Sequence, residues 1–358
     1  MRSKASTHSG AGGARYAPSS GLVRSFSPTL EFYAPKERLV LSGSAFGPEE
    51  PYVLGQIGDR FTGSVIWSSN RSGNHEIYRL DVANRTARLE PLTENPAVDT
   101  FPRFSPDGAT IVFNRSRADG ASSREPGAFD VWRMRADGSG QERLGPGFHP
   151  TFTADGAAVL FSRGGKVVRL ALADRREEVL LDAERALGGG AFEPDLFGPA
   201  LALTVRGRGR RAFGVYDLRR RSFRSFPGDS CQIAWWPGSE DLVWVEGHQG
   251  RGGTRIARGG TGDGRFETLI DLPSGMSHEY FPRPSRDGRW LAWSASRGDH
   301  DPDRADFDIF LWRAGTPWKE ALRISHDPGN DQWPDVRPDP ATIAESAGGP
   351  AQKVQDER

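Results

Sequence analysis

The sequence predicts an all-β fold, a six-bladed β-propeller closed by a C-terminal inner strand, and two observations carry this prediction. A turn signature recurs along the chain, with its clearest copy at Pro102-Arg103-Phe104-Ser105-Pro106-Asp107-Gly108. Aligned on Phe104, the copies fall at positions 104, 152, 192, 235, 284 and 336, which gives steps of 48, 40, 43, 49 and 52 residues. Such a period is typical of propellers, because one four-stranded sheet cannot bury both of its faces alone. The second observation is that the last copy has no strand after it.

The signature is a turn between two strands, so the strands can be assigned in chain order from it. Pro presets φ, Asp bonds to nearby backbone and Gly takes the φ > 0 position, which together predict a tight hairpin. In the second unit, strands are expected at 111–113, 129–134 and 141–144 after the turn. The sixth unit repeats this order with strands expected at 290–294, 307–312 and 321–324.

The two ends of the repeat region complement each other. The first unit, 64–93, has a second, third and fourth strand but no inner strand before them, whereas 332–337 is an inner strand alone. We therefore expect the last strand to complete the first blade, which removes exposed sheet edges. The chain then divides into a partly disordered N-terminal extension at 1–60, the propeller at 61–339 and a disordered tail at 340–358.

Composition narrows the classes of partner and compartment. The formal net charge is +0, so we expect neither nucleic acid nor an anionic membrane surface as partner. No segment is long and apolar enough for a membrane span or, within 1–20, for a signal peptide. The single cysteine, Cys231, excludes an internal disulfide, which is compatible with the cytoplasm or with a periplasmic protein without bridges. We expect a monomer.

The first unit also carries a motif that points to a known repeat. Asn70-Arg71-Ser72-Gly73-Asn74-His75-Glu76-Ile77-Tyr78, together with Phe-Ser-Pro-Asp-Gly and Asp137-Gly138-Ser139-Gly140, resembles the WD-like propeller repeat of the TolB type. The resemblance is strong in the first, second and sixth units and weak in the others. It implies a six-bladed propeller, often periplasmic, that binds proteins or ligands. Because this chain shows no export signal, the cytoplasm is the alternative compartment.

Histidines gather on one predicted face of the ring. In a propeller, the loops that enter each inner strand and those between second and third strands open on the same face. Six of the seven histidines map to these loops, and they are His75, His149, His248, His278, His300 and His326. The loop 297–305 of the sixth unit adds alternating carboxylates, which suit a hard cation. Mixed nitrogen and oxygen ligands favour manganese or zinc over calcium.

This face is therefore predicted to carry the site. The expected ligand contacts are His75, His278, Glu279, Asp299, His300, Asp331 and Trp333. The expected ligands of a divalent metal (calcium, manganese or zinc) are His278, His300, His326, Asp299, Asp301 and Asp303. The competing interpretation is a solvated acidic loop, in which an Asp before an inner strand caps backbone amides.

For function, we expect a non-enzymatic binding module that presents this face to a protein or saccharide partner, with or without a metal ion at the channel mouth. The alternative is a metal-dependent lyase or hydrolase acting on a carbohydrate. No catalytic residue is assigned, because no serine lies in a nucleophile motif. The eight arginines between Arg206 and Arg224 are either a charged sheet edge or a basic rim that attracts an anionic polymer.

Overall fold

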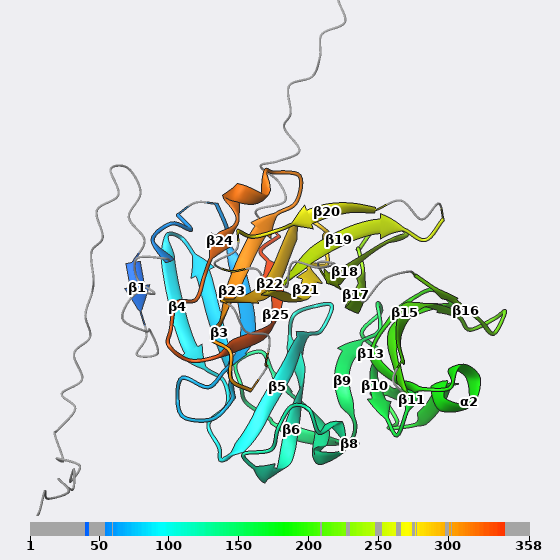
Figure 1. Ribbon diagram of the computed structural model, residues 1–358. Helices are drawn as coiled ribbons and strands as arrows, with labels where there is room; N and C mark the ends of the chain where they lie inside the picture. Colours follow the sequence, from blue (N-terminus) through cyan, green and yellow to red (C-terminus); the bar gives the residue numbers. More distant parts are fainter. Residues whose placement is uncertain are drawn as a thin grey trace, which may run out of the picture.

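The computed structural model confirms the six-bladed propeller (Figure 1). It describes residues 40–42, 54–58, 60–207, 210–226, 230–247, 253–262, 266–273, 276, 278–297, 301 and 303–340. Six mainly antiparallel sheets surround a central channel; the first strand is innermost in blades two to six, and β25 is innermost in blade one. Among these residues, no helix is long and apolar enough to cross a membrane.

Blades two to six are each built from four consecutive strands. Blade two is β5 (Ala97–Phe104), β6 (Thr110–Asp119), β7 (Phe129–Arg135) and β8 (Glu142–Pro146). Blade three is β9 (Phe148–Phe152), β10 (Ala158–Arg163), β11 (Lys166–Ala171) and β12 (Glu177–Asp182). Blade four is β13 (Gly190–Phe197), β14 (Ala200–Gly207), β15 (Arg210–Asp217) and β16 (Ser222–Ser225). Blade five is β17 (Ser230–Trp235), β18 (Asp241–Gly247), β19 (Thr254–Gly260) and β20 (Phe266–Ile270). Blade six is β21 (His278–Pro284), β22 (Trp290–Ser296), β23 (Phe307–Arg313) and β24 (Leu322–Arg323). Short helices in the described part of the chain include η1 (Pro126–Ala128), α2 (Ala183–Leu187) and η2 (Trp318–Glu320).

Blade one joins the two ends of the repeat region. Its strands β2 (Gly63–Ser69), β3 (Glu76–Ala83) and β4 (Thr86–Pro91) are completed on the channel side by β25 (Asp331–Pro338), which pairs antiparallel with β2. The predicted closure by a C-terminal inner strand is therefore confirmed. Strand β1 (Val40–Ser42), which belongs to the predicted N-terminal extension, adds a parallel partner to the outer edge of β4.

The turn chemistry of the signature is visible in blade two. The Asp107 carboxylate accepts hydrogen bonds from the Ser105 hydroxyl at 2.5 Å and from the Ala109 amide at 3.0 Å. Gly108 has φ of 71°, a left-handed conformation in which a side chain would be strained. Apolar strands on both sides of such turns pack between blades, and Trp67 and Trp293 are fully buried there.

The third copy of the signature, which lies in blade four, was placed wrongly. The prediction aligned Phe192 with Phe104, but the strand register makes Leu196 the equivalent residue, so the steps become 48, 44, 39, 49 and 52. The inner strand β13 shifts register between Phe192 and Asp195, as β5 does between Thr100 and Arg103. The misleading feature was Pro194, which belongs to this bulge.

Candidate functional site: a blind pocket on the loop face

One residue in each inner strand has a left-handed backbone, and together the six form a ring around the channel. They are Phe101, His149, Glu193, Gln232, Phe281 and Trp333, with φ between 53° and 58°. Each lies where the inner strand shifts register against its neighbour, so each is part of a β-bulge. A left-handed non-glycine residue costs about 1–2 kcal/mol. The fold therefore holds these six side chains in place at the channel axis against a local strain.

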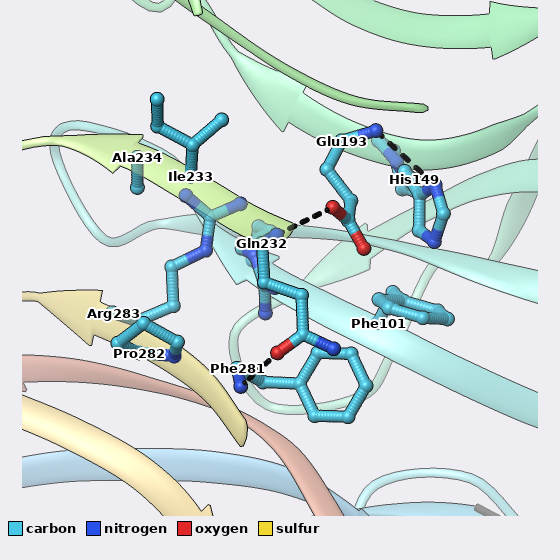
Figure 2. A pocket seen from close by; sticks show the side chains of 11 residues that line it. Phe101, His149, Glu193, Gln232, Ile233, Ala234, Phe281, Pro282 and Arg283 are labelled. Atoms are coloured by element: carbon cyan, nitrogen blue, oxygen red, sulfur yellow. Dashed lines mark hydrogen bonds between the residues drawn. The ribbon is translucent and has the colours of Figure 1, made fainter. Parts of the chain in front are cut away.

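The polar half of this ring is tied together by hydrogen bonds from blade to blade (Figure 2). His149 Nδ1 accepts from the Glu193 amide at 3.3 Å, and Glu193 Oε2 accepts from the Gln232 amide at 3.1 Å. Gln232 Oε1 in turn accepts from the Phe281 amide at 2.6 Å. A bulge leaves an amide outside the strand ladder, and a buried amide requires a partner. The polar side chain of each of these blades supplies that partner to the next blade.

The other half of the ring is aromatic. The Trp333 ring lies 4.7 Å from Phe101 and 5.8 Å from Phe281, measured between ring centroids. Phe101 also meets His149 edge to face at 4.4 Å. These contacts connect the aromatic half to the polar half, so the ring forms one packed layer across the channel.

This layer separates two cavities. On the loop face lies an upper cavity of about 610 Å³, lined by all six ring residues together with side chains from the surrounding loops. At the layer itself, the free space shrinks to about 20 Å³, enough for about one water molecule. On the opposite face lies a lower cavity of about 650 Å³. The upper cavity is therefore a blind pocket with the ring as its floor.

Charged residues lie directly beneath the floor. Arg103 is buried and donates to the carbonyls of Pro102 at 2.6 Å and Trp333 at 3.3 Å. Burial, followed by the charge of Arg283, lowers the pKa of Arg103 to about 9. Asp335 accepts from the Phe104 amide at 2.8 Å. Two arginines, Arg103 and Arg283, and two carboxyl groups, Asp195 and Asp335, thus lie beneath the ring.

Burial and the nearby arginines keep the His149 side chain neutral. Burial lowers the pKa of His149 well below its ordinary value, and the charges of Arg206, Arg103 and Arg283 lower it further. Because Nδ1 accepts the Glu193 amide, the ring proton is on Nε2. His149 is therefore a fixed hydrogen-bond donor in the pocket floor.

One predicted contact lines this pocket, and a second packs against it. Trp333 lines the upper cavity, and the His75 ring lies 5.3 Å from it. His75 Nδ1 is 2.9 Å from the Ser68 hydroxyl. Burial lowers the pKa of His75 to about 4, although the nearby Asp303 charge opposes this shift. His75 is thus a neutral packing partner of Trp333.

Two other predicted contacts are buried in the blades. Glu279 is 0% exposed; its Oε1 accepts from the Leu272 amide at 2.6 Å, and burial raises its pKa to about 8. Asp331 forms a buried ion pair with Arg71 at 2.9 Å. Both carboxyl groups precede a left-handed residue by two positions, and neither is among the residues that line the upper cavity. Their observed contacts are structural.

Asp301 and Asp303, the described carboxylates of the acidic loop of blade six, contact blade two. Asp301 pairs with Arg124 at 2.5 Å, and Asp303 accepts from the Ser122 hydroxyl at 2.7 Å. This bridge lies at the edge of the pocket, since Arg124 lines the upper cavity. His278 and His326 are half-buried on the loop side. Asp299 and His300 lie outside the described residues.

The described residues contain no group of three or more His, Cys, Asp or Glu side chains that could hold a metal ion. The predicted metal ligands therefore stay a prediction that depends on Asp299 and His300.

The arginine cluster of blade four is divided between the two faces. Arg206 and Arg211 line the upper cavity, whereas Arg220 pairs with Asp217 at the turn between β15 and β16.

Sequence reasoning missed most of the pocket floor, although a signal was present. Five of the six ring residues directly precede a proline, as in Phe101-Pro102 and Trp333-Pro334. The repeat was aligned on the turn that follows, so the residue before this proline was not compared between blades. It is the position at which each blade reaches the channel.

No family model matches the chain. Solved structures with a similar fold include TolB from Acinetobacter baumannii, with 15% identity, a TM-score of 0.59, and coverage of 77% of this chain and 67% of that chain. Putative TolB from Agrobacterium tumefaciens has 14% identity, a TM-score of 0.52, and coverage of 78% and 99%. Kuenenia stuttgartiensis hydrazine synthase has 14% identity, a TM-score of 0.53, and coverage of 77% and 47%. This likeness shows the fold, a TolB-like six-bladed propeller.

Proposed function

We propose that the protein is a non-enzymatic binding module that presents its loop face to a protein or saccharide partner. The observation that carries the proposal is the blind pocket of about 610 Å³ on that face, with a rigid ring as its floor. Concave sites with aromatic walls and a few fixed polar groups are the usual form of ligand sites in proteins. The pocket receives part of the partner, and the surrounding loops contact the rest.

The state of the floor residues supports binding over catalysis. A general base must offer a free acceptor atom to the reacting proton. His149 and Glu193 each use an acceptor atom for the backbone amide of the next blade. Glu193 Oε2 also accepts from the Thr204 hydroxyl at 3.0 Å. These groups are arranged to hold the ring together and to present fixed polar atoms.

The test is to block the pocket without changing charge. Ser123 lines the upper cavity, and Ala154 lines the lower cavity on the opposite face. We expect Ser123→Trp to weaken capture of partners, measured by cross-linking to cell extracts and on glycan arrays, while Ala154→Trp binds as the wild type does. Equal binding by both variants at an unchanged melting temperature would remove the loop face as the docking surface.

The alternative, a metal-dependent lyase or hydrolase acting on a carbohydrate, makes a separate prediction. His278, His300 and His326 would then hold the ion. Elemental analysis of protein purified without chelator, beside His278→Ala, tests this directly. Near-stoichiometric manganese, zinc or calcium that is lost in the variant, together with turnover abolished by chelator, would favour the enzyme. A binding module keeps its affinity in chelator.

We also propose a periplasmic location, on the strength of the TolB-type repeat, with the cytoplasm as the alternative. Immunodetection in osmotic-shock and spheroplast fractions of the producing cells tests this. Detection only in the spheroplast fraction would favour the cytoplasm.

A further inference from the structure

The upper cavity has an uneven charge distribution. Among the described residues, the charged ones that line it are three arginines, Arg124, Arg206 and Arg211, and one carboxylate, Glu193. Arg124 is compensated at the rim by Asp301 at 2.5 Å. Arg206 approaches Glu193 no closer than 4.0 Å, a weak contact, so the Glu193 carboxylate does not hold the Arg206 guanidinium group tightly.

Arg206 is held in a defined orientation above the floor. Its guanidinium carbon lies 5.0 Å from the centre of the Phe192 ring, within the range of a cation–π contact. Its side chain is 42% exposed, so its donors can reach a ligand in the cavity. Arg211 follows on β15, beside Arg206, with which it pairs in the strand register. Two guanidinium groups on adjacent strands thus border one side of the pocket.

The rest of the wall is rich in aromatic rings. Seven of the lining residues are Phe, Tyr or Trp, and they are Phe101, Phe148, Phe192, Tyr280, Phe281, Phe307 and Trp333. Such rings exclude water and offer flat surfaces for a ring of the ligand. A wall of low polarity also strengthens the attraction between a guanidinium group and an anion. The arginines therefore favour an anionic group on the ligand, and the aromatic wall favours a ring attached to that group.

We propose that the upper cavity binds a carboxylate attached to a ring, with Arg206 and Arg211 holding the carboxylate and the aromatic wall contacting the ring. Arginine forms two parallel hydrogen bonds to a carboxylate, which makes it the suitable residue for this task. This inference rests on the proposed function, since it names the chemistry by which the pocket recognises its partner. An aromatic acid and a sugar acid share this chemistry.

The experiment uses two matched pairs of small molecules, 2-naphthoate with 2-naphthamide and glucuronate with glucose. Affinity of the full chain for each is measured by isothermal titration calorimetry at low salt. The variants are Arg206→Gln and Arg211→Gln. The control is Arg219→Gln, an exposed arginine of the same blade at the turn on the opposite face. Melting temperatures establish that each variant is folded.

We expect at least one acid to bind about tenfold more tightly than its neutral counterpart, a difference of about 1.4 kcal/mol. That preference should disappear in Arg206→Gln or Arg211→Gln and persist in Arg219→Gln. The pair that responds identifies an aromatic or a sugar acid. The inference is overturned if neither acid is preferred, or if the preference survives both pocket variants. The two proposals can fail separately. If neither acid is preferred but Ser123→Trp, which changes no charge, still loses partner capture, the binding function stands and only the carboxylate inference is wrong.

Discussion

Replacing Glu279 with Gln should stabilise the protein at alkaline pH and remove part of its pH dependence. Glu279 was expected to contact a ligand, but its side chain is buried and bonded within the blades. Oε1 accepts from the Leu272 amide at 2.6 Å, and Thr254 Oγ1 is 3.3 Å from Oε2. Because burial disfavours the charged form, the pKa rises from the ordinary 4.5 to about 8.

The sign and size of the effect follow from linkage. Since the folded-state pKa lies above the unfolded value, the folded protein binds more protons between pH 4.5 and 8. The stability contributed by this carboxyl group is complete below pH 4.5 and is lost as pH rises through 8. With these two values, the loss between about pH 5 and about pH 8 is roughly 3 kcal/mol. A glutamine keeps an acceptor oxygen and cannot ionise.

The assay is urea unfolding of wild type and Glu279→Gln at both pH values. We expect the difference in unfolding free energy between the two proteins to shift by roughly 3 kcal/mol in favour of the variant at the higher pH. Asp331→Asn is the matched control, because this carboxyl group has the same place in blade one but pairs with Arg71 at 2.9 Å. It should destabilise by about 3 kcal/mol, since it breaks a buried ion pair. Equal pH dependence in wild type and Glu279→Gln would refute the reasoning.

Three further predictions concern the ring and its surroundings. Gln232→Ala removes the acceptor of the Phe281 amide and should cost about 1–3 kcal/mol in urea unfolding, whereas an unchanged midpoint would mean that the amide has another partner. Arg124→Ser breaks the exposed bridge to Asp301 and should change the melting temperature little. It should lower the association rate of 2-naphthoate, because a positive charge is lost from the cavity wall and Asp301 loses its cation; an unaltered rate would show that charge at this edge does not steer the ligand. Deleting 331–358 removes the inner strand of blade one and should cost several kcal/mol, so an unaltered melting temperature would contradict closure by β25.

The fold was predictable because its signals are local and repeated. The turn Ser105-Pro106-Asp107-Gly108 has close counterparts in blades three and six with the same side-chain bond to Asp, so the spacing of the copies gives the blade count and the closing strand. The fourth unit shows the limit of this reasoning. There the turn is degenerate, and Pro194 of the bulge was mistaken for the proline of the signature.

The site was less predictable, because its residues are defined by where the blades meet. His75 and Trp333 were both expected, but that they pack against each other follows only from ring closure. Asp301 was assigned to a metal for its spacing, whereas its partner Arg124 is 177 positions away in the sequence, as the two numbers show. Periodicity within one unit carries no information about such a contact between blades.

The ring also explains why the pocket floor and the pocket rim have different roles. A left-handed bulge in each inner strand leaves an amide to be satisfied, and on three consecutive blades a polar side chain does so. Changing His149, Glu193 or Gln232 therefore alters stability together with pocket shape, which restricts what these positions can contribute to recognition. The rim has no such constraint, since Arg206 and Arg211 take no part in this chain of bonds to the ring amides. Specificity can change at the rim while the floor stays constant, and for this reason the choice of ligand is best sought at these two arginines.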